Sequence, residues 1–223
     1  GEIVNVKEIT SKKRLQNGID VSKWNGTSGY SANISDGAIN FTATTQSTNS
    51  WVYLSTAMNT ISYKPTVGDW FEVRIKINDL TPLKERNKIQ FDLELYKDSK
   101  NLYKINHSAQ VVESGDLSIN QYYTISFPMP ENSGGWSNTS DRTYIAYKNI
   151  GTAVRMAFIP VGLKNPSTLK FAVDYIYIGP KEKLPSQQSS DVLYFGFDAD
   201  YTAQYRYGST VYGADNYDTG DKW

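Results

Sequence analysis

Few residues of this chain have the type and spacing that catalysis requires. His107 is the only histidine, and no serine or cysteine motif accompanies it, so no catalytic triad is indicated. Gly-x-Ser-x-Gly, His-Glu-x-x-His and phosphate-loop motifs are also missing from the sequence. Glycosidases need a pair of carboxylates, but strand alternation produces such pairs in any β protein, so we predict no catalytic residue and no enzyme activity. The carboxylates that could form such a pair are Glu72, Asp92, Glu94 and Glu113.

Aromatic and hydrogen-bonding side chains are the better candidates for chemistry, because together they can recognise a sugar. The chain has 17 tyrosine, 5 tryptophan and 8 phenylalanine residues, 13% of its length, whereas hydrophobic residues make up only 39%. Flat rings pack on the C–H faces of sugars while polar groups bond the hydroxyls. Tyrosine also simply suits strands, so both interpretations stay open. The candidate carbohydrate-binding residues are Trp51, Tyr53, Trp70, Glu72, Arg74, Tyr96, Trp136 and Tyr144.

Alternation predicts where most of these candidates point. Trp51 and Tyr53 alternate with two aliphatic residues, and we expect the aromatic pair to face outward. Trp70, Glu72 and Arg74 alternate in the same way, so we expect one sheet face to carry all five side chains. That face would be extended by Tyr96, Tyr122, Tyr144 and Tyr147.

Short alternating segments, bounded by Gly, Pro, Asn and Asp, recur along the chain and predict strands. No stretch has a long helical period, and no strand is continuously apolar as in an α/β barrel. The pattern therefore predicts an all-β fold, a β-sandwich of antiparallel strands. Residues 131–142 are expected to form a loop with Trp136 at its tip, where the ring has no evident packing role. The expected strands are 38–44, 50–55, 69–77, 88–96, 102–105, 110–113, 122–128, 144–147, 153–160 and 169–178.

Composition limits the classes of partner. The 23 basic and 23 acidic residues balance, so no electrostatic argument for nucleic acid or an anionic membrane follows. No apolar run is long enough to cross a bilayer. The chain has no cysteine, which excludes disulfides and thiolate metal sites. We expect neither nucleic-acid binding nor membrane insertion.

Four short patterns follow one another between Asn17 and Pro180. Asp20 and Trp24 open the segment, and a Gly-x-hydrophobic-x-hydrophobic strand and a tryptophan strand come next, at 37–41 and 51–54. The closing strand reads Phe-Ala-Val-Asp-Tyr-Ile-Tyr-Ile before Gly-Pro. This order resembles the jelly-roll carbohydrate-binding modules of families 4, 9 and 22, which accompany bacterial xylanases and β-glucanases. The resemblance implies a jelly roll that binds a polysaccharide or oligosaccharide without catalysis, in an extracellular or cell-surface protein.

The same resemblance implies a structural calcium ion between the opening segment and the closing strand. Asp20 and Asp174 stand where carboxylate ligands would be expected. Calcium takes six to eight oxygen ligands, and an Asp in an apolar strand is unfavourable if buried and unpaired. The alternative is that Asp174 faces solvent or pairs with a lysine, and no EF-hand loop decides between the two.

The ends of the chain predict a modular protein. The last residues, 216–223, echo Asn17–Trp24, as expected for a repeat. We predict that residues 192–197 pair with an edge strand or with a strand at Ile3–Ile9. The expected divisions are 1–15 as a leader or inter-module linker, 16–180 as the sandwich module, 181–190 as a linker, and 191–223 as a second, truncated module or as strands docked on the first.

Three functions follow, in order of preference. The first is a non-catalytic module that attaches a multimodular protein to a glycan, beside neighbouring modules of the same chain; the parent protein could itself be a glycoside hydrolase. The second is a structural spacer or adhesion repeat of a surface protein, and the third is a jelly-roll glycoside hydrolase or polysaccharide lyase. Gly18–Gly26 also resembles the opening strand of lysozymes of glycoside hydrolase family 25, but the alternating helices of that barrel do not follow.

Overall fold

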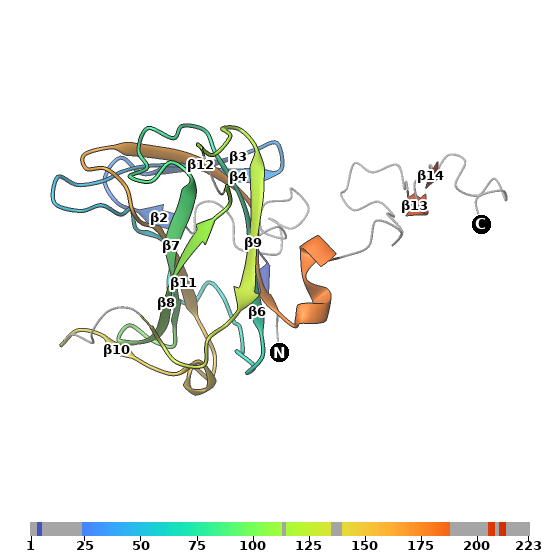
Figure 1. The fold of residues 1–223 in the computed structure, drawn as a ribbon. Coiled ribbons are helices and arrows are strands. Elements are labelled where there is room, and N and C mark those ends of the chain that lie inside the picture. Colours follow the sequence, from blue (N-terminus) through green and yellow to red (C-terminus); the bar gives the residue numbers. More distant parts are fainter. Residues whose placement is uncertain are drawn as a thin grey trace.

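Two β-sheets packed face to face form the body of the protein (Figure 1). The computed structural model describes residues 4–5, 24–112, 115–134, 140–187, 205–207 and 210–212. Within these residues the helical elements are short 3-10 turns, and none could cross a membrane. The prediction of an all-β sandwich is therefore confirmed.

Sheet A consists of β1 (Val4–Asn5), β3 (Ser31–Ser35), β4 (Ala38–Thr44), β6 (Trp70–Ile77), β9 (Tyr122–Pro128) and β12 (Thr168–Gly179). Its order is β3-β4-β12-β6-β9, and β1 pairs with the end of β12. Asp36 and Gly37 connect β3 to β4, with φ angles of 53° and 72°. Two successive residues with positive φ are typical of the tight hairpin turn that matches strand twist, which explains the Asp-Gly pair at this point.

Sheet B consists of β2 (Trp24–Gly26), β5 (Leu54–Thr56), β7 (Lys88–Tyr96), β8 (Asn101–Gln110), β10 (Thr143–Tyr144) and β11 (Arg155–Pro160). Its order is β10-β8-β7-β11-β5-β2. The short pair β10–β8 is parallel, whereas the other pairs of this sheet are antiparallel. An isolated bridge between Trp51 and Val161 lies in the same register as the pairing of β5 with β11, three residues beyond its last pair.

The core lies between the sheets and follows the predicted alternation. The apolar residues of β6 and β7 point inward and are nearly inaccessible, as expected from the period of two. Phe71 of β6 meets Phe91 of β7, with ring centroids 5.6 Å apart. Trp24 is 5% exposed and packs edge-on against Phe41, so it is a core residue and no sugar platform. The inward residues of the two strands are Phe71, Val73, Ile75, Ile77, Ile89, Phe91, Leu93 and Leu95.

Most predicted strands are confirmed, but several differ in extent. Of the strand predicted at 50–55, only Leu54 and Ser55 belong to β5, and Trp51 forms an isolated bridge. The strands at 38–44, 88–96 and 122–128 have the predicted bounds. The strand predicted at 102–105 is part of β8, which runs unbroken through polar residues to Gln110. Of the strand predicted at 110–113, only Gln110 belongs to β8, and the next two residues lie outside any strand. Of the strand predicted at 144–147, only Tyr144 belongs to β10, and the 3-10 turn η2 (Tyr147–Asn149) begins at the last residue of the predicted segment. β2 and β3 were not predicted, since both are short and polar.

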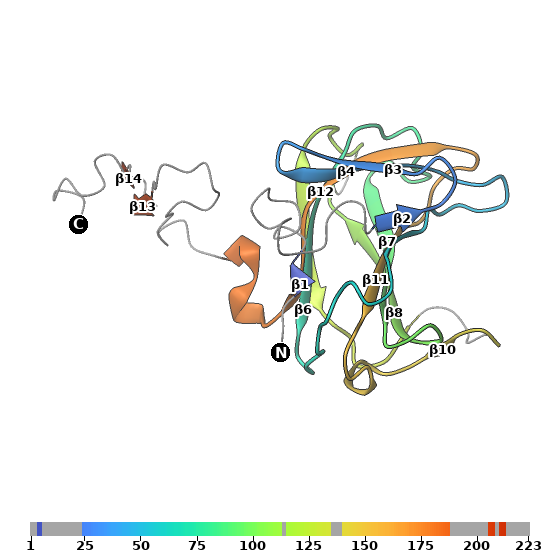
Figure 2. The same ribbon diagram turned by 180° about the vertical axis from the view of Figure 1, so that it is seen from behind.

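The first part of the segment predicted as a linker, residues 181–187, packs on the sandwich. It forms two 3-10 turns, η3 (Lys181–Lys183) and η4 (Pro185–Gln187), against the outer face of sheet A (Figure 2). Leu184 between them is fully buried, and Ser186 binds Glu72 of β6. β1 lies inside the strand expected at 3–9 and pairs Val4 with Ile178.

In the tail, β13 (Tyr205–Tyr207) pairs with β14 (Thr210–Tyr212). The pairing predicted for 192–197 concerns residues outside the described part of the chain, so it stays a prediction. The same holds for the proposed second module.

Candidate functional site

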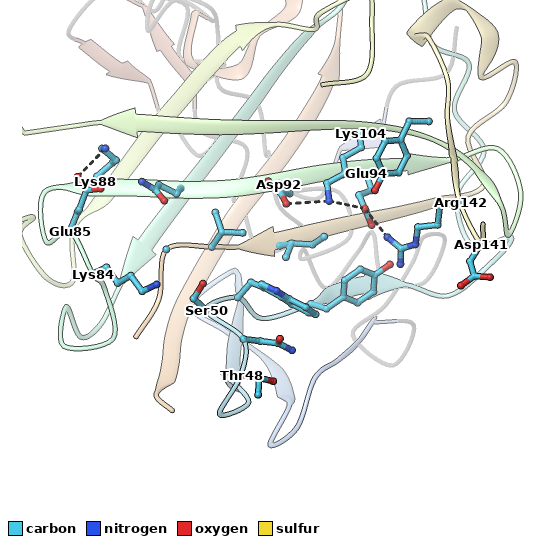
Figure 3. Close-up of a pocket in the computed structure, with 18 residues that line it drawn as sticks. Thr48, Ser50, Lys84, Glu85, Lys88, Asp92, Glu94, Lys104, Asp141 and Arg142 are labelled. Carbon is cyan, nitrogen blue, oxygen red and sulfur yellow. Dashed lines mark hydrogen bonds and ion pairs between the residues drawn. The ribbon is translucent and has the colours of Figure 1, made fainter. Parts of the chain in front are cut away.

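A groove of about 850 Å³ lies on the outer face of sheet B, the face turned away from the core (Figure 3). The even-numbered residues of β7 line it, because their odd-numbered neighbours fill the core. Gln90, Asp92 and Glu94 thereby form a polar row along the groove. Ile159 and Val161 add an apolar strip beside that row, since β11 pairs with β7.

The aromatic side of the groove comes from the segment that leads into β5. Trp51 is 39% exposed, the most accessible tryptophan in the described part of the chain. It lies beside Val161, its bridge partner, while Tyr53 is half-buried and Val52 between them is fully buried in the core. The expectation that the aromatic pair faces outward is therefore confirmed. An exposed indole next to an apolar strip is a surface that gains from being covered by a ligand.

The polar side of the groove is centred on Glu94, whose side chain is 0% exposed. Its carboxylate accepts a hydrogen bond from Tyr96 Oη at 2.8 Å and one from Arg142 Nη1 at 3.2 Å. Lys104 Nζ lies 3.6 Å from the same carboxylate and 3.4 Å from Asp92 Oδ2. A buried carboxylate is stable only with such partners, so the two cations are held where they face the groove.

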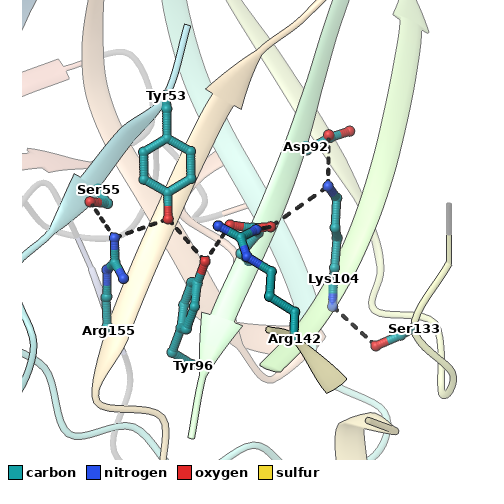
Figure 4. Close-up of polar contacts among 9 residues, drawn as sticks. Tyr53, Ser55, Asp92, Tyr96, Lys104, Ser133, Arg142 and Arg155 are labelled. Carbon is teal, nitrogen blue, oxygen red and sulfur yellow. Dashed lines mark hydrogen bonds and ion pairs between the residues drawn. The ribbon is translucent and has the colours of Figure 1, made fainter. Parts of the chain in front are cut away.

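The network continues from Glu94 to the aromatic side (Figure 4). The hydroxyls of Tyr96 and Tyr53 lie 2.9 Å apart, and Arg155 Nη2 donates to Tyr53 Oη at 3.0 Å. Arg155 also donates to Ser55 Oγ at 3.0 Å, which ties β11 to β5. Burial and the nearby Glu94 charge raise the pKa of both tyrosines, so their hydroxyls stay protonated and donate hydrogen bonds. Hydrogen bonds within the protein therefore hold these side chains of the groove in place.

Cations and carboxylates of the groove balance one another. Lys88 Nζ pairs with Glu85 Oε2 at 2.9 Å at one end, and Arg142 pairs with Glu94 at the other. Figure 3 shows these two pairs at opposite ends of the polar row, with Asp92 between them. The arrangement offers hydrogen-bond donors and acceptors without a strong field of either sign.

Four of the predicted binding residues come together at this groove. Trp51, Tyr53 and Tyr144 line it, and Tyr96 lies beneath it at 1% exposure, where it supports Tyr53. Trp136 lies outside the described residues, so its role stays a prediction. Sequence reasoning missed Arg142 and Lys104, and it considered Asp92 and Glu94 only as catalytic carboxylates.

The placement of Trp70, Glu72 and Arg74 on the same face as Trp51 is wrong. These three belong to β6 in sheet A, and they point away from sheet B on the opposite side of the sandwich. The ammonium of Lys181 covers the Trp70 ring at 4.7 Å, and Glu72 is completely buried under Ser186. Two extensions of that face are corrected too, because Tyr122 lies beside Arg74 in sheet A and Tyr147 is buried in the core.

The predicted calcium ligand Asp174 has another partner. It sits at a bulge of β12, and its Oδ2 accepts a hydrogen bond from Arg74 Nη1 at 2.8 Å. The described residues contain no group of three or more acidic or histidine side chains suited to a metal. Asp20, the other predicted ligand, lies outside them.

Comparisons with known proteins return only distant likenesses. No family model and no curated protein matches the chain. It is similar to a solved family 11 carbohydrate-binding module from Clostridium thermocellum in complex with a β-1,3-1,4-mixed-linked tetrasaccharide, with 12% identity, a TM-score of 0.45, and coverage of 74% of this chain and 91% of that one. It is also similar to a solved xylan-binding module of family 15, with 13% identity, a TM-score of 0.39, and coverage of 73% and 94%.

The structural neighbours thus include carbohydrate-binding modules, the class that the sequence patterns resemble. Larger chains are also among them: an agarase, at 8% identity and a TM-score of 0.45 over 88% of this chain, and PfGH50B, at 11% and 0.41 over 70%. This chain spans only 28% and 22% of their lengths. At these TM-scores the likeness decides nothing about the ligand, which has to be inferred from the groove.

Proposed function

We propose that the protein is a non-catalytic module that binds a polysaccharide or oligosaccharide in the groove of sheet B. The observation that carries this proposal is Trp51, an exposed ring beside the apolar strip of Ile159 and Val161 and across from a row of hydrogen-bonding side chains. A sugar ring has an apolar face and a polar rim, and such a groove offers a complement to both.

The two buried carboxylates of the groove, Asp92 and Glu94, favour binding over hydrolysis. A glycosidase acid or nucleophile has to reach the glycosidic bond. Glu94 is inaccessible, and its oxygens are engaged by Tyr96 and Arg142, while Asp92 is held by Lys104. Neither carboxylate is presented to a substrate as a catalytic group would be.

Affinity electrophoresis tests the proposal. The wild-type protein is run through native gels that contain mixed-linked β-glucan, xylan, mannan or an α-glucan, beside Trp51→Ala and Trp70→Ala. We expect at least one polysaccharide to retard the wild type and Trp70→Ala, and to retard Trp51→Ala much less. Folded wild-type protein that no polysaccharide retards would contradict the proposed function.

We further propose that the module acts outside the cell or at its surface, within a multimodular protein, since that is where the proposed polysaccharide ligands occur. Calcium remains a separate proposal that rests on the sequence resemblance. Melting temperatures measured in calcium and in a chelator test it: stabilisation by calcium that is lost in Asp174→Asn would support the site. Equal melting temperatures in the two buffers would exclude a structural ion.

A further inference from the structure

Glu94 occupies an unusual position, because it faces the groove but is closed off from it. Its side chain is 0% exposed, whereas Arg142, which it binds, is 38% exposed. A glycan in the groove can therefore reach the guanidinium but not the carboxylate.

The two oxygens of Glu94 lead to opposite sides of the groove. Oε1 accepts from Tyr96, whose hydroxyl contacts Tyr53 on the aromatic side. Oε2 accepts from Arg142 and lies 3.6 Å from Lys104 on the polar side. We infer that Glu94 is a positioning residue: it orients Arg142 as a donor to the glycan and links that donor to the aromatic side. This inference rests on the proposed function.

The orientation of the Arg142 side chain depends on Glu94 more strongly than the orientation of the Lys104 side chain does. Lys104 is 9% exposed and has a second carboxylate, Asp92, at 3.4 Å. Glu94 is the only carboxylate within ion-pair distance of Arg142 in the described part of the chain, and Arg142 belongs to the loop before β10. Without the charge of Glu94 the flexible arginine would turn into solvent, and ordering it on the ligand would then oppose binding.

A double-mutant cycle separates positioning from general stability. Glu94→Gln, Arg142→Gln and the double variant are compared for affinity to the polysaccharide that retards the wild type. We expect each single variant to bind about 10-fold more weakly, the value typical of one charged hydrogen bond. The double variant should also lose about 10-fold, because both changes remove the same donor from the ligand.

A loss near 100-fold in the double variant, as for independent effects, would overturn the inference, and so would unchanged affinity in Glu94→Gln. The matched control is Glu72→Gln, the same change in an equally buried carboxylate of the opposite sheet. It should lower the melting temperature and leave affinity unchanged. If Glu94→Gln does not fold, Tyr96→Phe replaces it: the residue is 1% exposed, so weaker binding supports the network and unchanged binding contradicts it.

Failure of the proposed function would be seen separately, as wild-type protein that binds none of the polysaccharides. The positioning of Arg142 is then decided without ligand, by ¹⁵N relaxation of its Nε–Hε group. An ordered group in the wild type that becomes mobile in Glu94→Gln confirms that Glu94 positions the side chain of Arg142, whatever the ligand of the groove. Equal mobility in the two proteins overturns it.

Discussion

The outer faces of the two sheets carry the same kinds of side chain, but other parts of the protein cover them to different extents. The face of sheet A presents Trp70, Glu72 and Arg74, and each is engaged by the protein itself, through Lys181, Ser186 and Asp174. The face of sheet B also presents tryptophan, carboxylate and arginine, but its tryptophan stays exposed along a groove. Residue type therefore does not distinguish a binding face from a covered one.

The two buried glutamates make the comparison sharper. Glu72 and Glu94 are both 0% exposed, and both lie on the outward side of a central strand. Glu72 accepts from the backbone N–H of Ser186 at 2.9 Å, so it fastens the segment that closes its face. Glu94 binds the side chain of Arg142, which remains partly exposed to the groove. The partner of the carboxylate decides whether the face is closed or kept open.

The largest effect on stability is expected when the 181–187 segment loses its attachment to the outer face of sheet A. Glu72→Ala takes away the acceptor of the Ser186 N–H and of the Tyr175 hydroxyl, which donates at 2.9 Å. Donors left without this buried acceptor should lower the free energy of unfolding by about 3 kcal/mol. Urea unfolding of the purified protein measures this loss.

Ser186→Ala provides the control, because it removes only a hydroxyl from the same contact and should cost about 1 kcal/mol. Both variants should keep their glycan affinity, since the groove lies on the other sheet. A Glu72→Ala protein as stable as the wild type would mean that the 181–187 segment is not fastened by this carboxylate.

The next effect concerns the two tryptophans. Trp51→Ala removes the exposed ring of the groove and should weaken glycan binding by about 2 kcal/mol, roughly 30-fold, as for a central contact residue. Trp70→Ala should leave affinity unchanged, because Lys181 covers that ring. Isothermal titration with the retarding polysaccharide measures both. Equal losses in the two variants would place the ligand elsewhere.

Alternation predicted the faces of individual strands well, but it could not assign strands to sheets. It correctly separated inward from outward residues in β6 and β7. It also placed Trp70 and Trp51 on one face, which the structure contradicts. The sheet to which a strand belongs depends on long-range pairing, such as that of Tyr177 with Glu72. The spacing of residues within one strand contains no information about this pairing.

The polar half of the groove was missed for a similar reason. Glu94 and Arg142 are 48 positions apart in the chain, and only the β10–β8–β7 arrangement brings them together. The break predicted within β8 has the same origin. His107 is polar in sequence, yet it is half-buried and stacks on Phe127 with ring centroids 4.1 Å apart, so the strand continues through it.

A smaller effect is expected from the titration of His107, which should make the stability of the protein depend on pH. Burial lowers its pKa below the ordinary 6.5. As pH falls below about 6.5, the unfolded chain takes up the proton first, so stability falls until pH passes the folded-state pKa. Urea unfolding between about pH 7.5 and pH 5 should show this decline in the wild type.

His107→Phe keeps an aromatic ring on Phe127 and removes the titration, so its stability should be flat over the same window. Asp79 and Asp98 do not confuse the result, because hydrogen bonds from nearby backbone N–H groups lower their pKa below 3.8. An equal decline in His107→Phe would assign the acid sensitivity to another group.

The smallest effect is expected at the ion pair on the covered face. Arg74 and Asp174 are 39% and 20% exposed, and solvent screens a pair of this kind. Arg74→Gln should lower the free energy of unfolding by about 0.5 kcal/mol and leave glycan affinity unchanged. Thermal unfolding at low and high salt checks the first part, since high salt should remove most of the difference between variant and wild type. A loss of glycan binding in Arg74→Gln would break the contrast between the faces, because it would show that the covered side of the sandwich also contacts the ligand.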